Sequence, residues 1–151
     1  MTEYDPNEAL KLNNQLCFPL YAAARKVTGL YTPYLRPLGL TYTQYLVFLV
    51  LWEKDGIPVS EICSRLLLDN GTVTPLLKKL EAEGYLSRVR SSADERCVVV
   101  TLTEEGRALK QKAADIPLRV GQCMNLDPAE AEIFYRMLYR ILGEEREENH
   151  E

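Results

Sequence analysis

The side chains best suited to covalent or metal chemistry in this chain are four cysteines and one histidine. The cysteines are widely spaced and form no CxxC pair: Cys17, Cys63, Cys97 and Cys123. His150 lies in a charged tail. Because a zinc site needs clustered Cys or His ligands, we expect no metal and no other cofactor. In a reducing cytosol the thiols should rest unpaired, and a thiolate can act as a nucleophile.

A second kind of chemistry, the recognition of phosphate, is indicated by the distribution of charge. The whole chain carries a net charge of −4, but the segment from Arg65 to Arg96 has six basic and five acidic residues, a net of +1. The segment from Glu144 to Glu151 has five acidic residues and one arginine, and it accounts for the overall sign. Phosphate contacts supply much of the affinity of proteins for DNA. The candidates for such contacts are Lys78, Lys79, Arg88, Arg90 and Arg96.

The segment 57–103 must position these basic residues, and its pattern predicts a helix, a turn, a helix, a strand, a loop and a strand. Apolar residues recur at helical spacing in two runs that meet at residues 68–71. The first run contains Val59, Ile62, Leu66 and Leu67, and the second contains Val73, Leu76, Leu77 and Leu80. Two β-like runs, 85–89 and 97–102, are joined by a polar loop. This order is typical of a winged helix-turn-helix.

Short polar side chains and a glycine mark the ends of the two helices. Ser60 is a candidate cap for the first helix, and Asp69 or Asn70 for the second, because their side-chain oxygens can accept hydrogen bonds from free backbone N–H groups. Gly84 supplies a C-terminal stop. The side chains that lie off the apolar stripe of the second helix are Thr72, Thr74, Lys78 and Lys79.

Helical periodicity also predicts elements on both sides of this segment. We expect a helix over 8–29 that Pro19 kinks or splits, and an apolar helix over 41–54 that Thr41 or Thr43 can cap. A polar helix capped by Thr103 and a last helix capped by Asp127 should follow the wing. The first and last of these helices carry wide apolar faces. Such faces suit either a dimer interface or packing within the chain.

Length and composition suit one folded domain, since the chain has 151 residues and 46% of them are hydrophobic. The chain has no run of 18 apolar residues that could cross a bilayer. Its first residues lack the basic and then apolar sections of a signal peptide. We therefore expect a cytoplasmic protein without a membrane partner.

The wing and the helix before it resemble the MarR family of bacterial repressors. The resemblance is carried by Asp94, Arg96, Leu102 and Thr103 and by the run LLKKLExxGYL, and it covers roughly residues 8 to 142. It implies a mainly α fold with a small β-wing in a single chain, residues 1–151. The implied parts are a winged helix-turn-helix DNA-binding region, 41–103, and dimerisation helices, 8–35 and 104–143. The implied partners are a second copy and double-stranded, near-palindromic operator DNA.

The resemblance also suggests how DNA is read. The helix over 70–83 would enter the major groove, where the residues facing base edges or phosphates are Asn70, Thr72, Thr74, Lys78 and Lys79. The wing would place Arg96 against the minor groove, whose negative potential favours a guanidinium, with Asp94 orienting it. The alternative is that Asp94 and Arg96 only close a hairpin and that the lysines are a solvated face.

Three runs resemble a narrower group, the organic hydroperoxide sensors called OhrR: LNNQLCFPLYA, TYTQYL and LDNGTVTPLLKK. This resemblance implies that Cys17 is a reactive thiol and that Tyr31 and Tyr42 donate hydrogen bonds that favour its thiolate. It also implies that Cys123 of the other chain resolves oxidised Cys17 as a disulfide. The remaining two thiols, Cys63 and Cys97, would be core fillers. The alternative is that Cys17 is a small buried hydrophobe and the tyrosines are core residues.

These observations predict a transcriptional repressor, not an enzyme, that senses an organic hydroperoxide through Cys17 and then releases its operator. One alternative is a MarR-type repressor that a small apolar or phenolic ligand releases, with no redox role for Cys17. Another is a thiol peroxidase, which the lack of a second base, a metal cluster or a phosphate loop disfavours. A third is an interaction module that binds no specific DNA.

Overall fold

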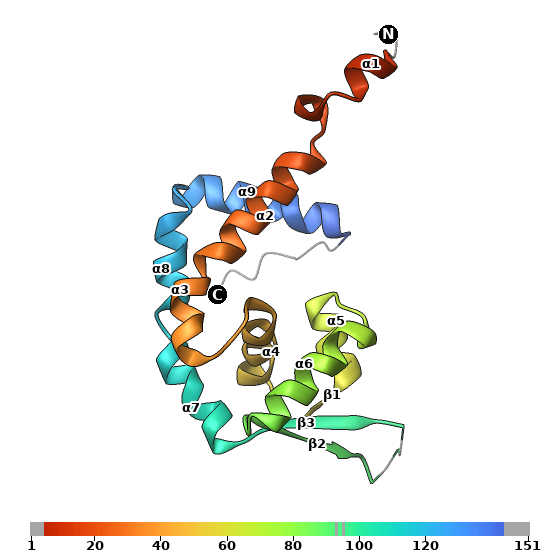
Figure 1. Cartoon of the computed structure of the whole chain (residues 1–151), viewed down its shortest axis with the longest axis vertical. Helices are drawn as coiled ribbons and strands as arrows, with labels where there is room; N and C mark the ends of the chain where they lie inside the picture. Colours follow the sequence, from red (N-terminus) through yellow and green to blue (C-terminus); the bar gives the residue numbers. More distant parts are fainter. Residues whose placement is uncertain (1–4, 93, 95, 144–151) are drawn as a thin grey trace.

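The structure, a computed structural model, describes residues 5–92, 94 and 96–143 (Figure 1). The helices are α1 (Pro6–Ala9), η1 (Leu12–Asn14), α2 (Cys17–Leu30), α3 (Thr32–Leu35), η2 (Arg36–Leu38), α4 (Tyr42–Glu53), α5 (Val59–Leu66), α6 (Asn70–Ala82), α7 (Glu104–Ala113), α8 (Ile116–Cys123) and α9 (Pro128–Leu142). The strands are β1 (Ile57–Pro58), β2 (Leu86–Arg90) and β3 (Val98–Leu102). The prediction of a mainly helical fold with a small β-wing is confirmed.

The elements that read DNA in a winged helix-turn-helix lie together at one end of the molecule. In Figure 1, α5 lies to the right of α4, α6 and the sheet lie lower, and α7 and α8 rise along the left side. The N-terminal arm, which we define as residues 5–20, projects beyond the rest of the molecule. The winged region is therefore connected to α2 through α3 and η2, and to α9 through α7 and α8.

The sheet has three antiparallel strands in the order β1-β3-β2. Ile57 of β1 pairs with Val100 of β3, and Leu86 of β2 pairs with Leu102. The sequence did not predict β1, because two residues are too short for an alternating pattern. The two predicted strands are confirmed within one residue at each end. The apolar stripe of α6 is also confirmed, since Val73, Leu77 and Leu80 are fully buried.

Most of the predicted helix caps are present. The side chains of Thr41, Asp69, Thr103 and Asp127 each accept a hydrogen bond from a backbone N–H in the first turn of the helix that follows. The prediction that Ser60 caps a helix is wrong. The chain leaves β1 in an extended conformation, so α5 already begins at Val59, and no side-chain cap is formed there.

The first helical segment is split, as Pro19 predicted. The pieces are α1, η1 and α2, and α2 begins only at Cys17. Pro19 therefore lies in the first turn of α2, where backbone N–H groups have no partner within the helix. Cys17 consequently lies at the free N-terminal end of a 14-residue helix.

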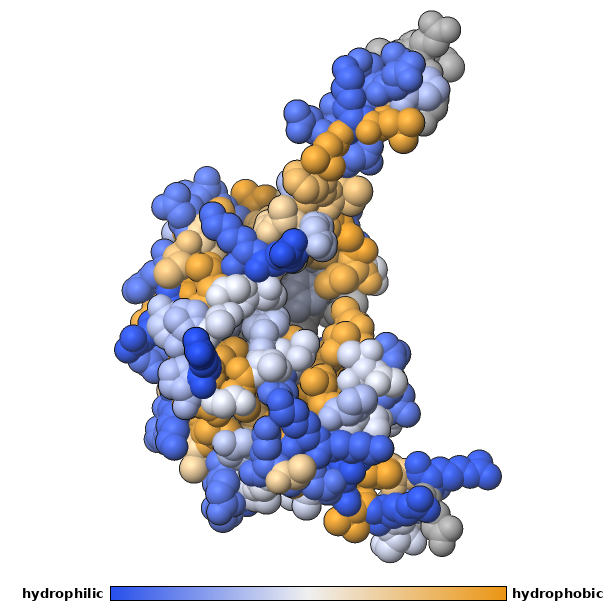
Figure 2. Space-filling view, viewed as in Figure 1, coloured by the Kyte–Doolittle hydropathy of each residue, from blue (hydrophilic) through white to orange (hydrophobic). Residues whose placement is uncertain are grey.

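The apolar faces of the first and last helices are not covered within the chain. No residue of α2 or α9 is buried. Large exposed side chains along the N-terminal arm and α9 include Leu12, Leu16, Phe18, Ile133, Phe134, Met137, Ile141 and Leu142. Figure 2 shows hydrophobic residues in orange along the arm. Packing within one chain therefore does not explain these faces. Among the described helices, none is long and apolar enough to cross a membrane.

Candidate functional site

A groove of about 640 Å³ lies between α5, the start of α6 and the wing. It is lined by five of the residues predicted to bind DNA, namely Asn70, Thr74, Arg88, Asp94 and Arg96. It is also lined by Pro58, Val59, Ser60, Cys63, Cys97 and Val98. The structure thus brings residues from α6 and from both wing strands to one surface.

The N-terminal turn of α6 is organised by Asp69. Its carboxylate accepts hydrogen bonds from the Thr72 backbone N–H at 2.9 Å and from the Thr72 hydroxyl at 2.7 Å. The hydroxyl bond is the main reason why the pKa of Asp69 lies below its usual value. The Thr74 hydroxyl lies 3.1 Å from the Asn70 side-chain oxygen. These bonds orient the side chains at the end of α6 that faces the groove.

Arg88, which we expected to contact phosphate, is bound to Glu81 instead. Its Nε and Nη2 atoms donate to Glu81 Oε2 at 2.9 and 2.7 Å, and its backbone N–H donates to Oε1 at 3.0 Å. The side-chain bond from Arg88 is the main reason why the pKa of Glu81 is lowered. The guanidinium of Arg88 therefore positions β2 against α6, and it is not a free cation.

The other predicted cations lie at the surface. Lys78, Lys79, Arg90 and Arg96 are exposed, and Lys79 forms a long ion pair of 3.9 Å with Glu83. Among the cations predicted to contact phosphate, these four are the ones that the fold leaves accessible to a phosphate backbone.

The wing turn brings Asp94 and Arg96 together through the backbone. The Asp94 carboxylate accepts a hydrogen bond from the Arg96 backbone N–H at 2.9 Å. Among the described residues, no ion pair joins this carboxylate to the Arg96 guanidinium. Asp94 thus shapes the turn from which Arg96 projects, by a bond to the Arg96 backbone and not to its guanidinium. Two residues of the predicted loop, 93 and 95, lie outside the described part of the chain.

Three phenols form what we call the tyrosine cluster: Tyr31, Tyr42 and Tyr45. The ring centroid of Tyr31 lies 4.8 Å from that of Tyr42 and 5.7 Å from that of Tyr45. Burial raises the pKa of Tyr31, and burial together with the neighbouring phenol raises the pKa of Tyr42. The same effects raise the pKa of Tyr45 to about 12. All three hydroxyls therefore keep their protons at neutral pH and can donate hydrogen bonds.

Cys17 does not lie beside these phenols within one chain. It is the first residue of α2, and Tyr31 follows the last residue of that helix. With a rise of about 1.5 Å per residue, the two positions are separated by roughly 21 Å along the helix. The Cys17 side chain is exposed in the single chain, so it is not a core residue there. The second part of that alternative fits the structure, because Tyr45 belongs to the buried core and Tyr31 and Tyr42 pack against it. The expected contact between Cys17 and the two phenols is absent from the single chain.

The other thiols lie in different surroundings, and all four are free. Cys123 is exposed at the end of α8. Cys63 packs against the core, where burial and then the Asp69 carboxylate raise the pKa of its thiol. Cys97 is half-buried at the end of the wing loop, directly before β3, and lines the groove. The assignment as a core filler therefore fits Cys63 better than Cys97.

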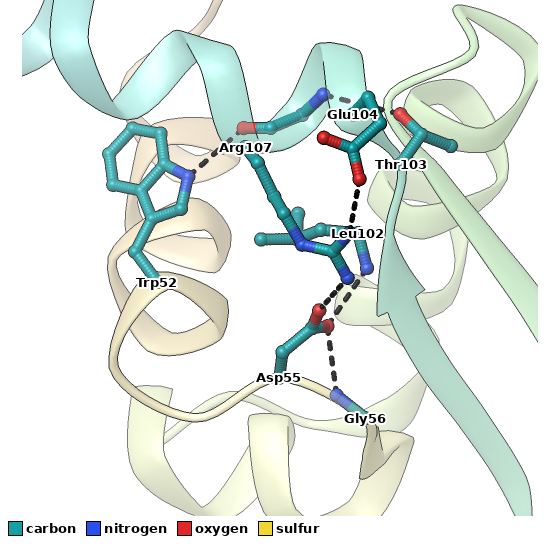
Figure 3. A network of polar contacts seen from close by, with 8 residues as sticks. Trp52, Asp55, Gly56, Leu102, Thr103, Glu104 and Arg107 are labelled. Atoms are coloured by element: carbon teal, nitrogen blue, oxygen red, sulfur yellow. Dashed lines mark hydrogen bonds and ion pairs between the residues drawn. The ribbon is translucent and has the colours of Figure 1, made fainter.

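Sequence reasoning missed a polar network where the winged region meets α7 (Figure 3). The Asp55 carboxylate accepts hydrogen bonds from the Leu102 and Gly56 backbone N–H groups and from Arg107, each at 2.8 Å. The Trp52 indole donates to the Gly106 carbonyl at 3.0 Å. Apart from Gly56, the partners are about 50 residues apart in the chain, so no local pattern could reveal them.

The chain is similar to known regulators over most of its length. The family described as transcriptional regulator SarA/Rot matches residues 29–113. The organic hydroperoxide resistance transcriptional regulator of Bacillus subtilis is 51% identical over 72% of this chain and 74% of that protein. SarZ of Staphylococcus aureus is 39% identical over 80% of this chain and 81% of that protein.

Solved structures agree with this assignment. Reduced AbfR bound to DNA is 35% identical, with a TM-score of 0.74, and the match covers 91% of this chain and 95% of AbfR. AbfR with its disulfide formed is 34% identical, with a TM-score of 0.62 over 90% and 96% of the two chains. AbfR is a protein of Staphylococcus epidermidis. These relatives are DNA-binding regulators and not enzymes, and the chain belongs to the SarA/Rot and MarR-type family of winged-helix transcriptional regulators.

Proposed function

We propose that this regulator is a homodimeric repressor that leaves its operator when an organic hydroperoxide oxidises Cys17. The observation that carries the proposal is the separation of an exposed thiol at one end of α2 from a cluster of protonated phenols at the other end. The proposal is supported by the 51% identity to an organic hydroperoxide resistance regulator. It is also supported by the similarity to AbfR, which has been solved in reduced, overoxidised and disulfide forms.

The bare apolar faces of the N-terminal arm, α2 and α9 favour a second copy as the partner that covers them. A monomer rarely leaves so many large apolar side chains of neighbouring helices in water. If two α2 helices pack in opposite directions, the start of one lies beside the end of the other. Cys17 of one chain then meets the tyrosine cluster of the partner. In this arrangement 8–35 and 104–143 are the dimerisation segments, and 41–103 is the DNA-binding region.

The proposed chemistry needs only a thiolate and hydrogen-bond donors. Donors such as the hydroxyls of Tyr31 and Tyr42 favour the charged form of a nearby thiol. The Cys17 thiolate attacks the terminal oxygen of the hydroperoxide, the O–O bond breaks, and the alcohol leaves after taking up a proton. Sulfur loses two electrons and becomes a sulfenic acid, while the peroxide is reduced. Apolar neighbours such as Phe18 and Leu20 suit an alkyl hydroperoxide.

In the second step Cys123 of the partner resolves the sulfenic acid. Its thiol attacks the Cys17 sulfur, an S–S bond forms, and the oxygen leaves as water. Cys123 is exposed on α8, which packs beside α2. A covalent link across the dimer would shift α2 against α8. Because each chain carries one recognition helix, such a shift changes the distance between two α6 helices and weakens binding to a two-fold operator.

On DNA, α6 of each subunit would enter the major groove. Its exposed residues, Asn70, Thr72, Lys78 and Lys79, and the half-buried Thr74 offer groups that can contact base edges and phosphates. The wing would contribute Arg90 to phosphates and Arg96 to the minor groove. Arg88 would act indirectly by holding the wing against α6.

Non-reducing electrophoresis after treatment with cumene hydroperoxide tests the proposal. Wild type and the control Cys63→Ser should form a covalent dimer, whereas Cys17→Ser and Cys123→Ser should not. In a DNA-binding assay, cumene hydroperoxide should release the wild type and leave Cys17→Ser bound. A Cys17→Ser protein that leaves DNA on oxidation would refute the redox role of Cys17.

A second candidate is a repressor released by a small ligand. A pocket of about 400 Å³ lies between α2, α3 and the start of α4, beside Tyr42. It is lined by Thr28, Thr32, Leu35, Arg36, Gly39, Leu40, Thr41 and Tyr42. A phenolic compound that releases wild type and Cys17→Ser equally well would favour this function over hydroperoxide sensing.

A further inference from the structure

We infer that Trp52 is the positioning residue that passes a change at the tyrosine cluster to α7 and the wing. The inference rests on the proposed function, because it concerns how oxidation of Cys17 alters DNA binding. Trp52 is the only tryptophan of the chain. It lies near the end of α4 and packs against the core.

On one side, Trp52 belongs to a continuous stack of rings. Its ring centroid lies 6.3 Å from that of Tyr45, edge to face, and 5.3 Å from that of Phe48, nearly parallel. Tyr45 in turn contacts Tyr31, which contacts Tyr42. Rings packed at these distances move together, because a close-packed interior has no space into which one ring can shift alone.

On the other side, Trp52 is bonded to α7 by its indole and its backbone. The indole N–H donates to the Gly106 carbonyl at 3.0 Å, and the Trp52 carbonyl accepts from Lys110 Nζ at 3.2 Å. Both partners belong to α7. Figure 3 shows the indole pointing from α4 toward the first turn of α7. A displacement of the Trp52 ring therefore displaces α7 through these bonds.

The part of α7 that Trp52 contacts lies directly on the wing. A Cβ atom on Gly106 would overlap the Tyr85 carbonyl oxygen, so the two backbones are in close contact where the chain enters β2. The same carbonyl accepts a hydrogen bond from the Thr103 backbone N–H at 3.1 Å. The Thr103 hydroxyl bonds the Gly84 carbonyl at 2.7 Å. Movement at Gly106 is thus passed to the beginning of β2.

These contacts form one unbroken path from Tyr42 through Tyr31, Tyr45 and Trp52 to Gly106. A donor to the Cys17 thiolate must rearrange when that sulfur becomes a sulfenic acid or a disulfide. The path offers a packed, hydrogen-bonded route by which this rearrangement changes the angle of the wing. The indole N–H is the link of this path that one substitution can remove without removing a ring. The Phe48 ring, which contacts Trp52 and also lies edge to face with Tyr85 at 5.9 Å between centroids, stays in place.

The variant Trp52→Phe tests the inference, since phenylalanine keeps a ring in the stack and removes only the N–H donor. We would measure its dissociation constant for a duplex that the wild-type protein selects from a random library, before and after treatment with cumene hydroperoxide. The ratio of the oxidised to the reduced constant should fall by about tenfold, within the range typical of coupling between sites. The reduced constant and the rate of Cys17 oxidation should stay close to wild type.

Lys54→Met is the matched control. It removes a bond of 3.0 Å from the same end of α4, but to Glu61 of α5 and not to α7. Its ratio of oxidised to reduced constants should equal that of the wild type. A stable Trp52→Phe protein with the full wild-type ratio would overturn the inference.

Fluorescence of the wild type gives a second test that needs no folded variant. Because Trp52 is the only tryptophan, its emission reports the indole environment directly. Oxidation should shift the emission of wild type and leave that of Cys17→Ser unchanged. Emission that stays constant while wild type leaves DNA would overturn the inference and leave the proposed function intact. If wild type does not leave DNA on oxidation, the proposed function fails, and this inference fails with it.

Discussion

Arg88 and Glu81 join the wing to the recognition helix by three hydrogen bonds. Two run from the guanidinium to Glu81 Oε2 at 2.7 and 2.9 Å, and one from the Arg88 backbone N–H to Oε1 at 3.0 Å. A planar guanidinium held in this way has a defined orientation. The pair therefore sets the position of β2 relative to α6, so that the wing and the helix proposed to read DNA are joined as one unit.

Replacement of Arg88 should weaken DNA binding without changing its dependence on salt. Arg88→Met removes the link to Glu81, so the wing loses its fixed position and affinity should fall severalfold at every salt concentration. The slope of log K against log salt should stay at the wild-type value, because no phosphate contact is lost. Fluorescence anisotropy over a series of salt concentrations measures both quantities.

Lys78→Met is the comparison for that experiment. Lys78 is exposed on α6, and loss of a phosphate contact should reduce the slope by about 0.9 per contact. A slope for Arg88→Met that falls as much as the slope for Lys78→Met would show that Arg88 contacts phosphate after all.

Gly106 should not tolerate a larger residue. An added Cβ would overlap the Tyr85 carbonyl oxygen and lie 3.1 Å from Leu102 Cδ2. Because the overlap is with backbone, relief requires α7 to move away from the wing. Gly106→Ala should lower the free energy of unfolding by about 1–3 kcal/mol, as overpacking usually does. Urea denaturation followed by circular dichroism measures the change.

Gly121→Ala serves as the control for Gly106→Ala. Gly121 also lies in a helix, but nothing lies within 4 Å of its Cβ position. The added methyl should increase stability by about 0.5–1 kcal/mol through helix propensity. Equal effects of the two substitutions would mean that the contact between Gly106 and Tyr85 is not tight.

Asp55 should contribute stability that disappears in acid. Partial burial alone would raise the pKa of Asp55, but hydrogen bonds from Arg107, Leu102 and Gly56 outweigh it, so the pKa lies below 3.8 in the folded chain. The unfolded chain then binds more protons as the pH falls, and folding becomes less favourable. The stability difference between wild type and Asp55→Asn should be constant from pH 7 to about pH 4 and shrink below that.

Asp115→Asn is the appropriate comparison for Asp55→Asn. Asp115 also pairs with an arginine, Arg119, but the two side chains are more than half exposed. Solvent screens such a pair, so its loss should change stability little at any pH. Urea denaturation between pH 3 and 7 measures both variants. A pH-independent difference for Asp55→Asn would contradict the assigned network.

The phenols should set the reactivity of Cys17 in the dimer. Tyr42→Phe removes one hydroxyl donor and keeps the ring contact with Tyr31, whose centroid lies 4.8 Å away. The rate of sulfenic acid formation at pH 7 should fall by about tenfold, because one hydrogen bond to a charged group is worth about 1.5 kcal/mol or more. Trapping of the sulfenic acid with dimedone, followed by mass spectrometry, measures the rate.

Tyr21→Phe controls for the loss of a hydroxyl from the same region. Tyr21 is exposed on α2, and its hydroxyl lies 3.3 Å from Arg25. Its replacement should leave the rate unchanged. A Tyr42→Phe protein that reacts as fast as wild type would remove Tyr42 from the sensor.

The sequence alone determined the features that depend on neighbouring residues. The starts of four helices could be predicted from their cap residues, because a cap bonds to backbone only two or three positions away. These caps are Thr41, Asp69, Thr103 and Asp127. The stripe on α6 was visible because residues three or four apart share one face of a helix. The order of elements and the winged fold followed from these local signals. The predicted cap at Ser60 was wrong because the preceding strand, and not a side-chain cap, decides where α5 begins.

The tertiary structure alone decided which distant groups meet. The bonds of Asp55 with Leu102 and of Trp52 with Gly106 connect residues 47 and 54 positions apart, and no periodic pattern encodes such pairs. The same holds for the distance between Cys17 and the tyrosine cluster, which depends on α2 being one straight helix between them. Helical periodicity reports which face of a segment avoids water, whereas the identity of the groups that cover that face depends on how the whole chain packs.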